Sequence, residues 1–258
     1  MKIGHFVHKN KKFYGLIEEN IVYEINGNIY TEFERNNNKY ELDDLKYLPP
    51  TSPSKIVAVG LNYKDHAAEL KMNIPDEPVI FLKPSTTVIA HNENIIYPSI
   101  SGRVDYEAEL AVVIKKEMYK VKKDEASKYI LGYTCANDVT ARDLQKKDGQ
   151  WTRAKSFNTF CPLGPWIYIP LPKDNFDPHN LKIQTKVNGS IKQNSNTSNL
   201  IFKIEYLLEF ISSIMPLFPG DIVITGTPKG IGPILPGDKI EVIIESIGKL
   251  QNFCISEK

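Results

Sequence analysis

The sequence is short of the features that mark secreted and membrane-bound proteins. It contains three cysteines, which show neither CxxC spacing nor an even number, and this favours free thiols in a reducing compartment over a disulfide framework. No apolar run reaches the roughly 18 residues of a membrane-spanning helix, and the segment MKIGHFVHKNKKFYG contains no apolar signal region. We therefore expect a cytoplasmic protein with no membrane partner.

A surplus of charge is equally absent. The 32 Lys and Arg residues nearly balance the 31 Asp and Glu residues, for a formal net charge of +1. The chain therefore offers no basic field for nucleic acid and no acidic tail. Its 258 residues, 41% hydrophobic and 24% charged, have the composition of an ordinary globular protein.

What is present is a series of short apolar runs separated by polar turns. In the first 50 residues these runs predict strands over residues 3–7, 13–17 and 21–25. The proline-rich segment 47–53 that follows predicts a stiff linker. We therefore expect a small N-terminal β domain over residues 1–50 and a larger domain over residues 54–258.

Beyond the linker, strands outnumber helices. The pattern predicts helices over residues 62–71, 124–129, 140–146 and 203–215, of which the last has the clearest apolar face. It predicts strands over residues 55–60, 79–82, 104–115, 130–136, 182–187, 221–225, 239–245 and 250–255. Asn188 and Gly189 predict a type I′ hairpin turn. The expected fold class is α+β, mainly β, with the helices at the periphery.

The strand predicted over residues 104–115 carries two carboxylates on one face. Glu107 and Glu109 are two residues apart, so their side chains point the same way, about 7 Å apart along the chain. Such a pair repels unless a cation lies between the two groups or one of them keeps its proton. Asp138 closes the next apolar run and could complete a site of oxygen ligands, which suits Mg²⁺, Mn²⁺ or Ca²⁺ better than zinc. A solvated strand face with lysine partners is the other interpretation.

Two further segments carry residues suited to catalysis. In GLNYKDHAAEL, His66 and Glu69 share one face of the predicted helix, so the carboxylate could orient the imidazole as a base for water. An exposed ion pair is the alternative, and Asp65 could compete for the same imidazole. Lys155, set among small and aromatic residues, could pair with a substrate carboxylate or stabilise an enolate, although most lysines are only solvated.

The segment ITGTPKGIGPILPGD superficially suggests phosphate binding. It does not fit the P-loop pattern, because Lys229 is followed by Gly230 and no helix pattern follows. We interpret it as a tight loop that presents the hydroxyls of Thr225 and Thr227 and backbone amides to an anion. A plain structural turn explains the same residues.

The motifs of the larger domain follow one another in a characteristic order. They read VAVGLNYKDHAAEL, PVIFLKPST, DYEAELAVVI, GYTCANDVTARDLQ, GQWTRAKSFNTFCPLGP, VNGSIKQNSNTSNLIF and PGDIVITGTPKGIGP. Together they resemble the fumarylacetoacetate hydrolase family, in particular its smaller bacterial branch of acylpyruvate hydrolases, oxaloacetate decarboxylases and 2-hydroxyhepta-2,4-diene-1,7-dioate isomerases. The resemblance extends from residue 54 to the C-terminus.

The resemblance implies a fold, an assembly and a metal site. The family fold is a mixed, highly twisted β-roll, and its members are typically homodimers. Glu107, Glu109 and Asp138 fall on the family's metal ligands, which usually hold Mg²⁺ or Mn²⁺. We therefore expect Mg²⁺ as the cofactor, with Mn²⁺ or Ca²⁺ as alternatives.

The resemblance also implies catalytic and substrate-binding residues. His66 and Glu69 fall on the family's acid/base dyad, which a short lid helix carries over the bound ligand. Lys155 matches the active-site lysine. The remaining matches are residues that contact the substrate, namely Arg142, Gln145 and Thr227.

This residue set implies an enzyme that acts on a small 2-oxo acid through a metal-stabilised enolate. Attack of water on a C4 ketone would hydrolyse the C–C bond of an acylpyruvate, whereas a C4 carboxylate would leave as CO₂, as in oxaloacetate decarboxylation. Reprotonation of the enolate at another carbon would give the 2-hydroxyhepta-2,4-diene-1,7-dioate isomerase reaction. Hydrolysis and decarboxylation form the first hypothesis; the isomerase and a catalytically silent metal-binding homologue are the alternatives.

One departure from the family pattern concerns the N-terminal part. The hydrolases that give the family its name carry a much longer N-terminal domain, which contains a further metal-ligating Asp. Here residues 1–50 precede the shared core and contain no comparable motif. We therefore expect a 2-oxo acid smaller than fumarylacetoacetate as the substrate.

Overall fold

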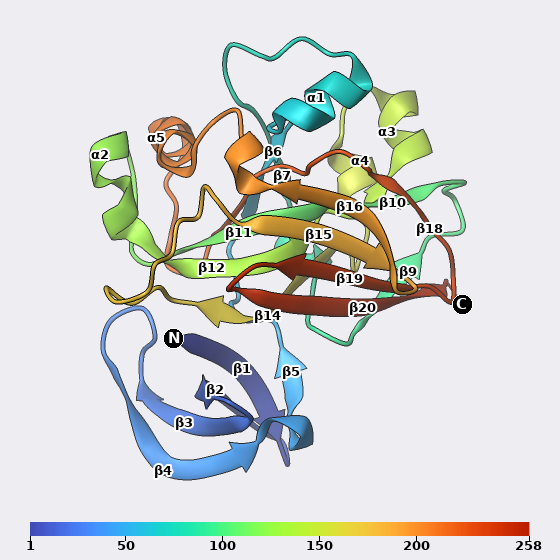
Figure 1. The fold of residues 1–258 in the computed structure, drawn as a ribbon. Helices are drawn as coiled ribbons and strands as arrows, with labels where there is room; N and C mark the ends of the chain where they lie inside the picture. Colours follow the sequence, from blue (N-terminus) through green and yellow to red (C-terminus); the bar gives the residue numbers. More distant parts are fainter. Residues whose placement is uncertain (258) are drawn as a thin grey trace.

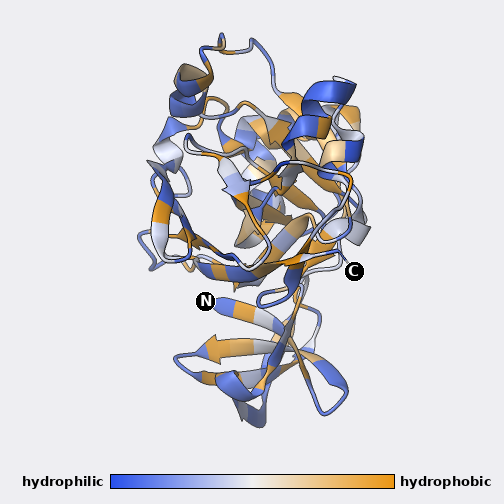
Figure 2. Cartoon of the chain, turned by 90° about the vertical axis from the view of Figure 1, so that its right-hand side faces the viewer, coloured by the Kyte–Doolittle hydropathy of each residue, from blue (hydrophilic) through white to orange (hydrophobic). Residues whose placement is uncertain are grey.

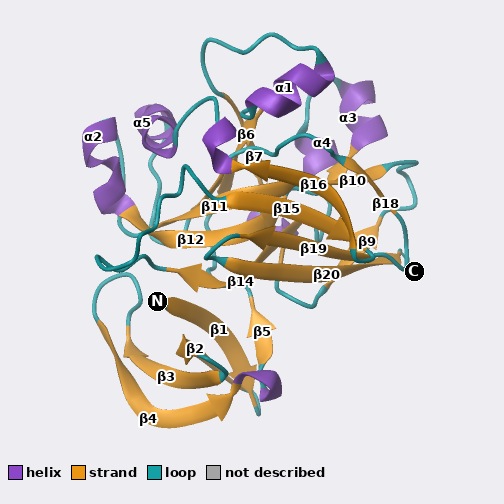
Figure 3. Ribbon diagram, in the orientation of Figure 1, coloured by secondary structure: helices purple, strands orange, loops and turns teal. Residues whose placement is uncertain are grey.

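The structure, a computed structural model, describes residues 1–257 and consists mainly of strands, with the helices at the periphery (Figure 1, Figure 3). The helices are α1 Lys64–Leu70, α2 Lys123–Ala126, α3 Arg142–Asp148, α4 Thr152–Lys155 and α5 Ile204–Ile214. Single 3₁₀ turns lie at Leu42–Asp44, Ser85–Thr87, Ser127–Tyr129 and Thr197–Asn199. The prediction of an α+β fold in which strands dominate is confirmed.

One large mixed sheet runs through the molecule. Its strands follow the order β4-β3-β2-β1-β14-β12-β11-β17-β6-β7, with β5 beside β1 and β8 beside β14. Their bounds are β1 Lys2–His8, β2 Lys11–Glu18, β3 Ile21–Gly27, β4 Phe33–Glu41, β5 Lys46–Leu48, β6 Ile56–Gly60, β7 Val79–Lys83, β8 Val88–Ile89, β11 Ala108–Ile114, β12 Ile130–Asn137, β14 Cys161–Tyr168 and β17 Ile222–Ile224.

Two smaller sheets complete the fold. One has the order β13-β10-β18 and the other the order β16-β15-β19-β20-β9. Their bounds are β9 Asn94–Tyr97, β10 Val104–Tyr106, β13 Thr140–Ala141, β15 Lys182–Val187, β16 Ser190–Asn196, β18 Gly232–Ile234, β19 Lys239–Ile244 and β20 Gly248–Ser256. The hairpin predicted between β15 and β16 is present, and Asn188 and Gly189 both have positive φ, at 50° and 81°, as a type I′ turn requires.

Strands β1 to β5 form a unit below the rest of the molecule in Figure 1. The unit has a small hydrophobic cluster of its own, made of Phe6, Phe13, Ile17, Val22 and Leu45. It is tied to the rest because β1 pairs with β14, with Ile3 opposite Ile167. Strand β4 was not predicted from the sequence, because FERNNNKYE is polar and gains its strand partner only from β3. The division into two domains stays a prediction.

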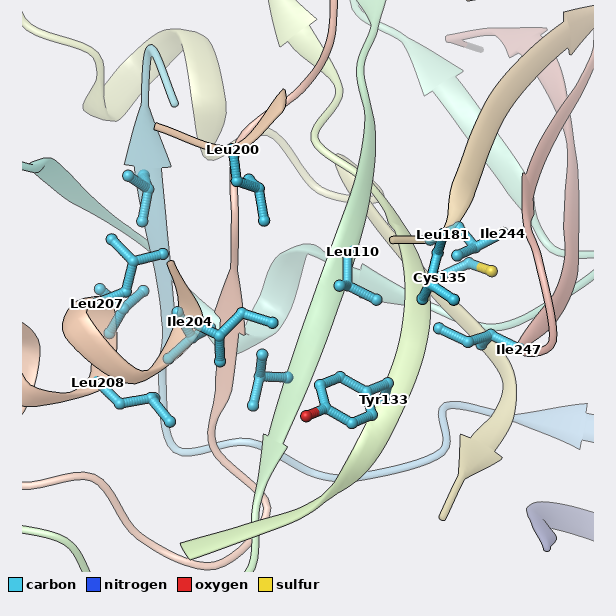
Figure 4. Packing of buried hydrophobic residues seen from close by; sticks show 14 of the residues in the cluster. Leu110, Tyr133, Cys135, Leu181, Leu200, Ile204, Leu207, Leu208, Ile244 and Ile247 are labelled. Atoms are coloured by element: carbon cyan, nitrogen blue, oxygen red, sulfur yellow. The ribbon is translucent and has the colours of Figure 1, made fainter. Parts of the chain in front are cut away.

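The main core lies on both faces of β11, an interior strand of the large sheet. Leu110 points into a cluster that also contains Tyr133 of β12 and Leu207 of α5 (Figure 4). Ala111 and Val113 belong to a second cluster on the opposite face. Figure 2 shows hydrophobic residues concentrated on the strands and hydrophilic residues on turns and outer helices. Burial on both faces explains why β11 reads as a continuous apolar run interrupted only by Glu109.

Two local predictions were wrong in detail. The strand expected over residues 104–115 is divided at Glu107, so that β10 pairs with β13 and β18 whereas β11 pairs with β12 and β17. The apolar face predicted for the helix over residues 203–215 includes Ile214, but this residue is 53% exposed in the structure. It lies in the last turn of the helix, rotated by about 80° from the direction of Ile204.

Two expectations about composition can be compared with the structure. Cys135, Cys161 and Cys254 are buried and free, which agrees with the prediction of unpaired thiols. Within residues 1–257, none of the helices combines the length and the apolar character that a bilayer crossing requires.

Candidate metal centre and active site

Three buried carboxylates meet near the junction of β10, β11 and β12. Glu107 lies in the break between β10 and β11, Glu109 is the second residue of β11, and Asp138 directly follows β12. One oxygen atom from each of the three side chains lies within 4.8 Å of the others. None of the three residues is more than 6% exposed. The structure therefore brings these carboxylates together and excludes the alternative of a solvated strand face.

The backbone fixes this convergence. The amide of Asp138 donates to the carbonyl of Glu107 at 2.9 Å. The amide of Glu107 donates to the side-chain oxygen of Asn137, also at 2.9 Å. Because these two bonds cross between the start of β11 and the end of β12, they hold Glu107 and Asp138 close to one another.

Two buried lysines neutralise part of the charge. Lys155, at the end of α4, donates to Glu107 at 2.9 Å and to Asp138 at 2.6 Å. Lys83, at the end of β7, donates to the other oxygen of Asp138 at 2.6 Å and to the carbonyl of Val139 at 3.3 Å. Neither lysine is more than 2% exposed. Lys155 is therefore not a solvated lysine, and Asp138 is held through both of its oxygens.

Arg142, the first residue of α3, joins this cluster to a further carboxylate. Its guanidinium donates to Glu107, to Asp105 at 2.9 Å and to Gln145 at 2.6 Å. Asp105 is fully buried and also accepts a hydrogen bond from Arg103 at 2.8 Å. Each guanidinium at the site is thus already paired with a carboxylate.

The pKa values distinguish Glu107 from Glu109. Burial alone would raise the pKa of Glu107, but Lys155 and Arg142 outweigh it and lower that pKa to about 2. Burial and the neighbouring Asp138 and Glu107 carboxylates raise the pKa of Glu109 well above its ordinary value. Within residues 1–257, no lysine or arginine donates a hydrogen bond to Glu109; its bond comes from the amide of Gly226.

This oxygen set fits a hard divalent cation. Three carboxylate oxygens within 4.8 Å of one another match the preference of Mg²⁺, Mn²⁺ and Ca²⁺ for oxygen ligands. A cation would also relieve the repulsion that raises the pKa of Glu109. The buried acidic triad can therefore bind a divalent metal ion.

The loop after β17 supplies the amide that contacts Glu109. Gly226 donates to that carboxylate at 2.6 Å. It has φ +94°, and a Cβ at this position would lie 2.8 Å from the Cβ of Asn62, so the conformation and the close approach both require glycine. Thr225 donates to the carbonyl of Leu110 at 3.0 Å. The anion that this loop contacts is thus a side chain of the protein itself.

The hydroxyl of Thr227, at the end of this turn, lies at the candidate site. Gln193 of β16 donates to it at 2.9 Å and accepts from the amide of Ala108 at 2.9 Å. Gln193 is fully buried. It therefore connects Thr227 to the start of β11, where the metal-ligand candidates lie.

Helix α1 carries the predicted dyad. Nδ1 of His66 lies 3.0 Å from a carboxylate oxygen of Glu69, which also accepts from the amide of Gly230. The imidazole of His66 is buried, whereas the side chain of Glu69 is 38% exposed, so the alternative of an exposed ion pair holds for the carboxylate and not for the histidine. Asp65 does not compete for the imidazole, because it accepts a hydrogen bond from Ser195 at 2.6 Å.

A cavity of about 270 Å³ connects these groups. Eight of the nine predicted site residues line it: His66, Glu107, Glu109, Asp138, Arg142, Gln145, Lys155 and Thr227. The ninth, Glu69, lines an adjoining cavity together with His66. Lys146 and several apolar side chains form most of the remaining wall, the apolar ones being Val59, Leu61, Leu70, Met72, Phe81 and Trp151. The helices that contribute to the site, α1, α3 and α4, lie together at the upper right of Figure 1.

Sequence reasoning missed several residues that support the site. Lys83, Asp105, Asn137 and Gln193 each contact a residue of the cluster, but no local pattern marks them as functional. One sequence feature could have pointed to Lys83, namely that it is a single lysine at the end of the apolar strand PVIFLK. The partner of Lys83 lies 55 residues away along the chain, so spacing could not reveal the contact.

Comparison with known families identifies this arrangement. The profile of the fumarylacetoacetate (FAA) hydrolase C-terminal family matches residues 55–254. The chain belongs to the fumarylacetoacetate hydrolase family. A second profile, Rv2993c-like N-terminal, matches residues 1–50.

Several relatives are similar over most of the chain. A protein of Archaeoglobus fulgidus without a named activity is 59% identical, and the match covers 83% of this chain and 84% of that protein. The rat mitochondrial oxaloacetate tautomerase Fahd2a is 44% identical over 79% of this chain and 67% of its own length. The crystal structure of 2-hydroxyhepta-2,4-diene-1,7-dioate isomerase from Mycobacterium marinum has a TM-score of 0.92 at 39% identity and covers 100% of this chain and 99% of that one.

Proposed function

We propose that this fumarylacetoacetate hydrolase family member is a divalent-metal-dependent enzyme that forms the enol or enolate of a small 2-oxo acid. The observation that carries the proposal is the buried triad of Glu107, Glu109 and Asp138 at the wall of the 270 Å³ cavity. Within residues 1–257, Glu109 is the carboxylate of the triad to which no lysine or arginine donates a hydrogen bond, and a cation beside it would relieve its repulsion from Glu107 and Asp138. The same cavity holds a lysine and a histidine suited to proton transfer.

The triad would hold Mg²⁺, with Mn²⁺ or Ca²⁺ as alternatives. When bound, such an ion supplies a Lewis acid for the 2-oxo and carboxylate oxygens of the substrate. The ammonium of Lys155, which lies between Glu107 and Asp138, offers a second positive group where negative charge develops on the 2-oxo oxygen. Arg142 and Gln145 would contact the substrate from the adjoining wall, and Thr227 would contact its carboxylate.

His66 would move the proton. Its Nδ1 is occupied by Glu69, so Nε2 is the ring atom left to take a proton from C3 of the 2-oxo acid or to return one to it. Glu69 fixes the orientation of the ring. Leu70, Met72 and Trp151 add apolar surface to the wall of the same cavity.

The names of the relatives favour proton transfer without cleavage of a C–C bond as the reaction class. The rat protein is named an oxaloacetate tautomerase and the mycobacterial protein a dienedioate isomerase. Both names describe a proton that leaves one atom and returns to another. We therefore propose tautomerisation or isomerisation of a 2-oxo acid as the first activity of this chain.

Cleavage of a C–C bond is the second candidate, and the His66–Glu69 dyad favours it. A buried imidazole oriented by a carboxylate can take a proton from water as readily as from carbon. With an acylpyruvate, that water would attack the C4 ketone and the C3–C4 bond would break, so that the acyl group leaves as a carboxylic acid and the other part as the enolate of pyruvate, which then takes up the proton at C3. With oxaloacetate, the same enolate would form by loss of CO₂.

The test is a side-by-side assay of oxaloacetate tautomerisation, oxaloacetate decarboxylation and acetylpyruvate hydrolysis, with Mg²⁺ and then with EDTA. Mg²⁺-dependent conversion of either 2-oxo acid supports the proposal, and the fastest of the three reactions identifies the activity. Conversion that is undiminished in EDTA contradicts metal dependence. Metal binding without any conversion favours the catalytically silent homologue.

A further inference from the structure

We propose that Lys146 determines specificity by binding the distal carboxylate of a dicarboxylic 2-oxo acid. The proposal rests on the function proposed above and concerns the same site. It assigns to Lys146 a preference for substrates with a second carboxylate, such as oxaloacetate, over substrates that end in a neutral acyl group, such as acetylpyruvate.

The position of Lys146 on α3 is the first observation. Arg142, Gln145 and Lys146 are three and four residues apart, so they share one face of the helix. All three line the 270 Å³ cavity that contains the carboxylate triad. Lys147, the next residue, lines neither that cavity nor the adjoining one.

The adjoining cavity is the second observation. It has a volume of about 390 Å³ and is lined by His66, Glu69, Arg103 and the same three residues of α3, among others. It therefore continues the active-site cavity past the His66–Glu69 dyad. A substrate whose 2-oxo group lies at the triad can extend its far end along this continuation, with Lys146 at the shared wall of the two cavities.

The pairing of the cations is the third observation. Arg142 and Arg103 both bind Asp105, and Lys155 is held between Glu107 and Asp138. Within the part of the chain that the structure describes, the exposed Lys146 is the one lysine or arginine of these cavity walls that makes neither a hydrogen bond nor an ion pair. A second substrate carboxylate would therefore find its free partner at Lys146.

The other lysine and arginine side chains of these walls are already paired with carboxylates, and Gln145 carries no charge. Leu70, Met72 and Trp151 are apolar, and contact with them would strip water from a carboxylate without replacing its hydrogen bonds. A neutral acyl group gains nothing from Lys146 and suits the apolar side chains. The two substrate types are therefore separated by one charged contact.

The experiment compares Lys146→Gln with Lys147→Gln. Both lysines lie in the last turn of α3 and interact alike with the helix dipole, so Lys147→Gln controls for the loss of a charge at that position. The readout is the ratio of kcat/KM for oxaloacetate to kcat/KM for acetylpyruvate, measured with Mg²⁺. Loss of one charge-assisted hydrogen bond in Lys146→Gln should lower this ratio about tenfold, mainly through KM for oxaloacetate.

Two further measurements separate specificity from a structural role. Lys146→Arg should restore most of the ratio, because it returns the charge. Salt should raise KM for oxaloacetate less in Lys146→Gln than in the wild type, because screening has one contact fewer to weaken.

The outcomes distinguish the two proposals. A ratio that is the same in Lys146→Gln, Lys147→Gln and the wild type overturns the assignment of Lys146 and leaves the proposed function standing. A wild-type protein that converts neither substrate with Mg²⁺ overturns the proposed function, and this inference with it.

Discussion

Asp221 and Glu109 are both buried carboxylates, with exposures of 0% and 1%, and they meet different surroundings. Asp221 lies just before β17 and accepts hydrogen bonds from one ammonium, one hydroxyl and three backbone amides, contributed by Ser54, Lys55 and Phe218. Glu109 accepts one hydrogen bond, from the amide of Gly226, and has two further carboxylates beside it.

The different surroundings shift the pKa values of the two carboxyl groups in opposite directions. Burial disfavours the charge of Asp221, but its donors, with Lys55 foremost, outweigh burial and lower its pKa. Burial and two like charges act together on Glu109 and raise its pKa. The chain has completed the first site by itself, which stabilises the fold. At the second site, no lysine or arginine within residues 1–257 donates a hydrogen bond to Glu109, so an external cation can lie against this carboxylate.

The largest effect should come from Glu109→Gln. The variant removes one charged oxygen ligand, so metal affinity and kcat/KM should each fall by more than about 100-fold, beyond the loss seen for residues that only support a ligand. Without metal, the variant should be at least as stable as the wild type, because an amide is not repelled by Glu107 and Asp138. Activity assays and thermal unfolding in EDTA check both points, and a destabilised metal-free variant would contradict the comparison.

The next effect should come from His66→Ala, which alters neither carboxylate site. Loss of the proton-transfer group should lower kcat by about 10³-fold while Mg²⁺ affinity stays near that of the wild type. Steady-state kinetics and a metal titration on the same preparation provide the check. Wild-type kcat in this variant would remove the dyad from the mechanism.

Asp221→Asn should do the opposite of Glu109→Gln. It takes the negative charge away from Lys55 and from three amides, and should lower the free energy of unfolding by about 2 kcal/mol. The activity of the folded fraction should stay unchanged, because Asp221 lies outside the cavity. Urea unfolding in EDTA, alongside an activity assay at low temperature, measures both quantities. A higher free energy of unfolding in Asp221→Asn would contradict the claim that Asp221, unlike Glu109, stabilises the metal-free fold.

The smallest effect concerns how the loss of stability in Asp221→Asn depends on pH. The folded-state pKa of Asp221 lies below the unfolded value of about 3.9, so its stabilisation is fully present above that pH and disappears as the pH falls through the folded-state pKa. The stability difference between the wild type and Asp221→Asn should be constant at neutral pH and narrow in acid. Urea titrations across the acid range test this, and a difference that widens in acid would have the wrong sign.

The sequence predicted what depends on local spacing. The alternation of residues 107–110, the Asn188-Gly189 turn and the apolar positions of α5 other than Ile214 each depend on neighbours a few residues away, and each is present in the structure. The mainly β fold follows from many such patterns together.

Contacts between distant segments were beyond those patterns. The division of the predicted strand at Glu107 depends on Asn137, 30 residues further on. The contact of Lys83 with Asp138 joins β7 to the end of β12 across the large sheet. β4 becomes a strand because β3 offers it a partner. These features arise from the packing of the whole chain, which spacing alone does not describe.

A calorimetric titration of Mg²⁺ into metal-free wild-type protein and into Glu109→Gln, under the same conditions, tests most directly whether the carboxylate triad binds metal. We predict that the wild type binds a single ion and releases a proton at pH values below the raised pKa of Glu109. The variant should show no comparable binding. Equal binding by the two proteins, or no binding by the wild type, would contradict the claim that the Glu107, Glu109 and Asp138 triad is a metal site.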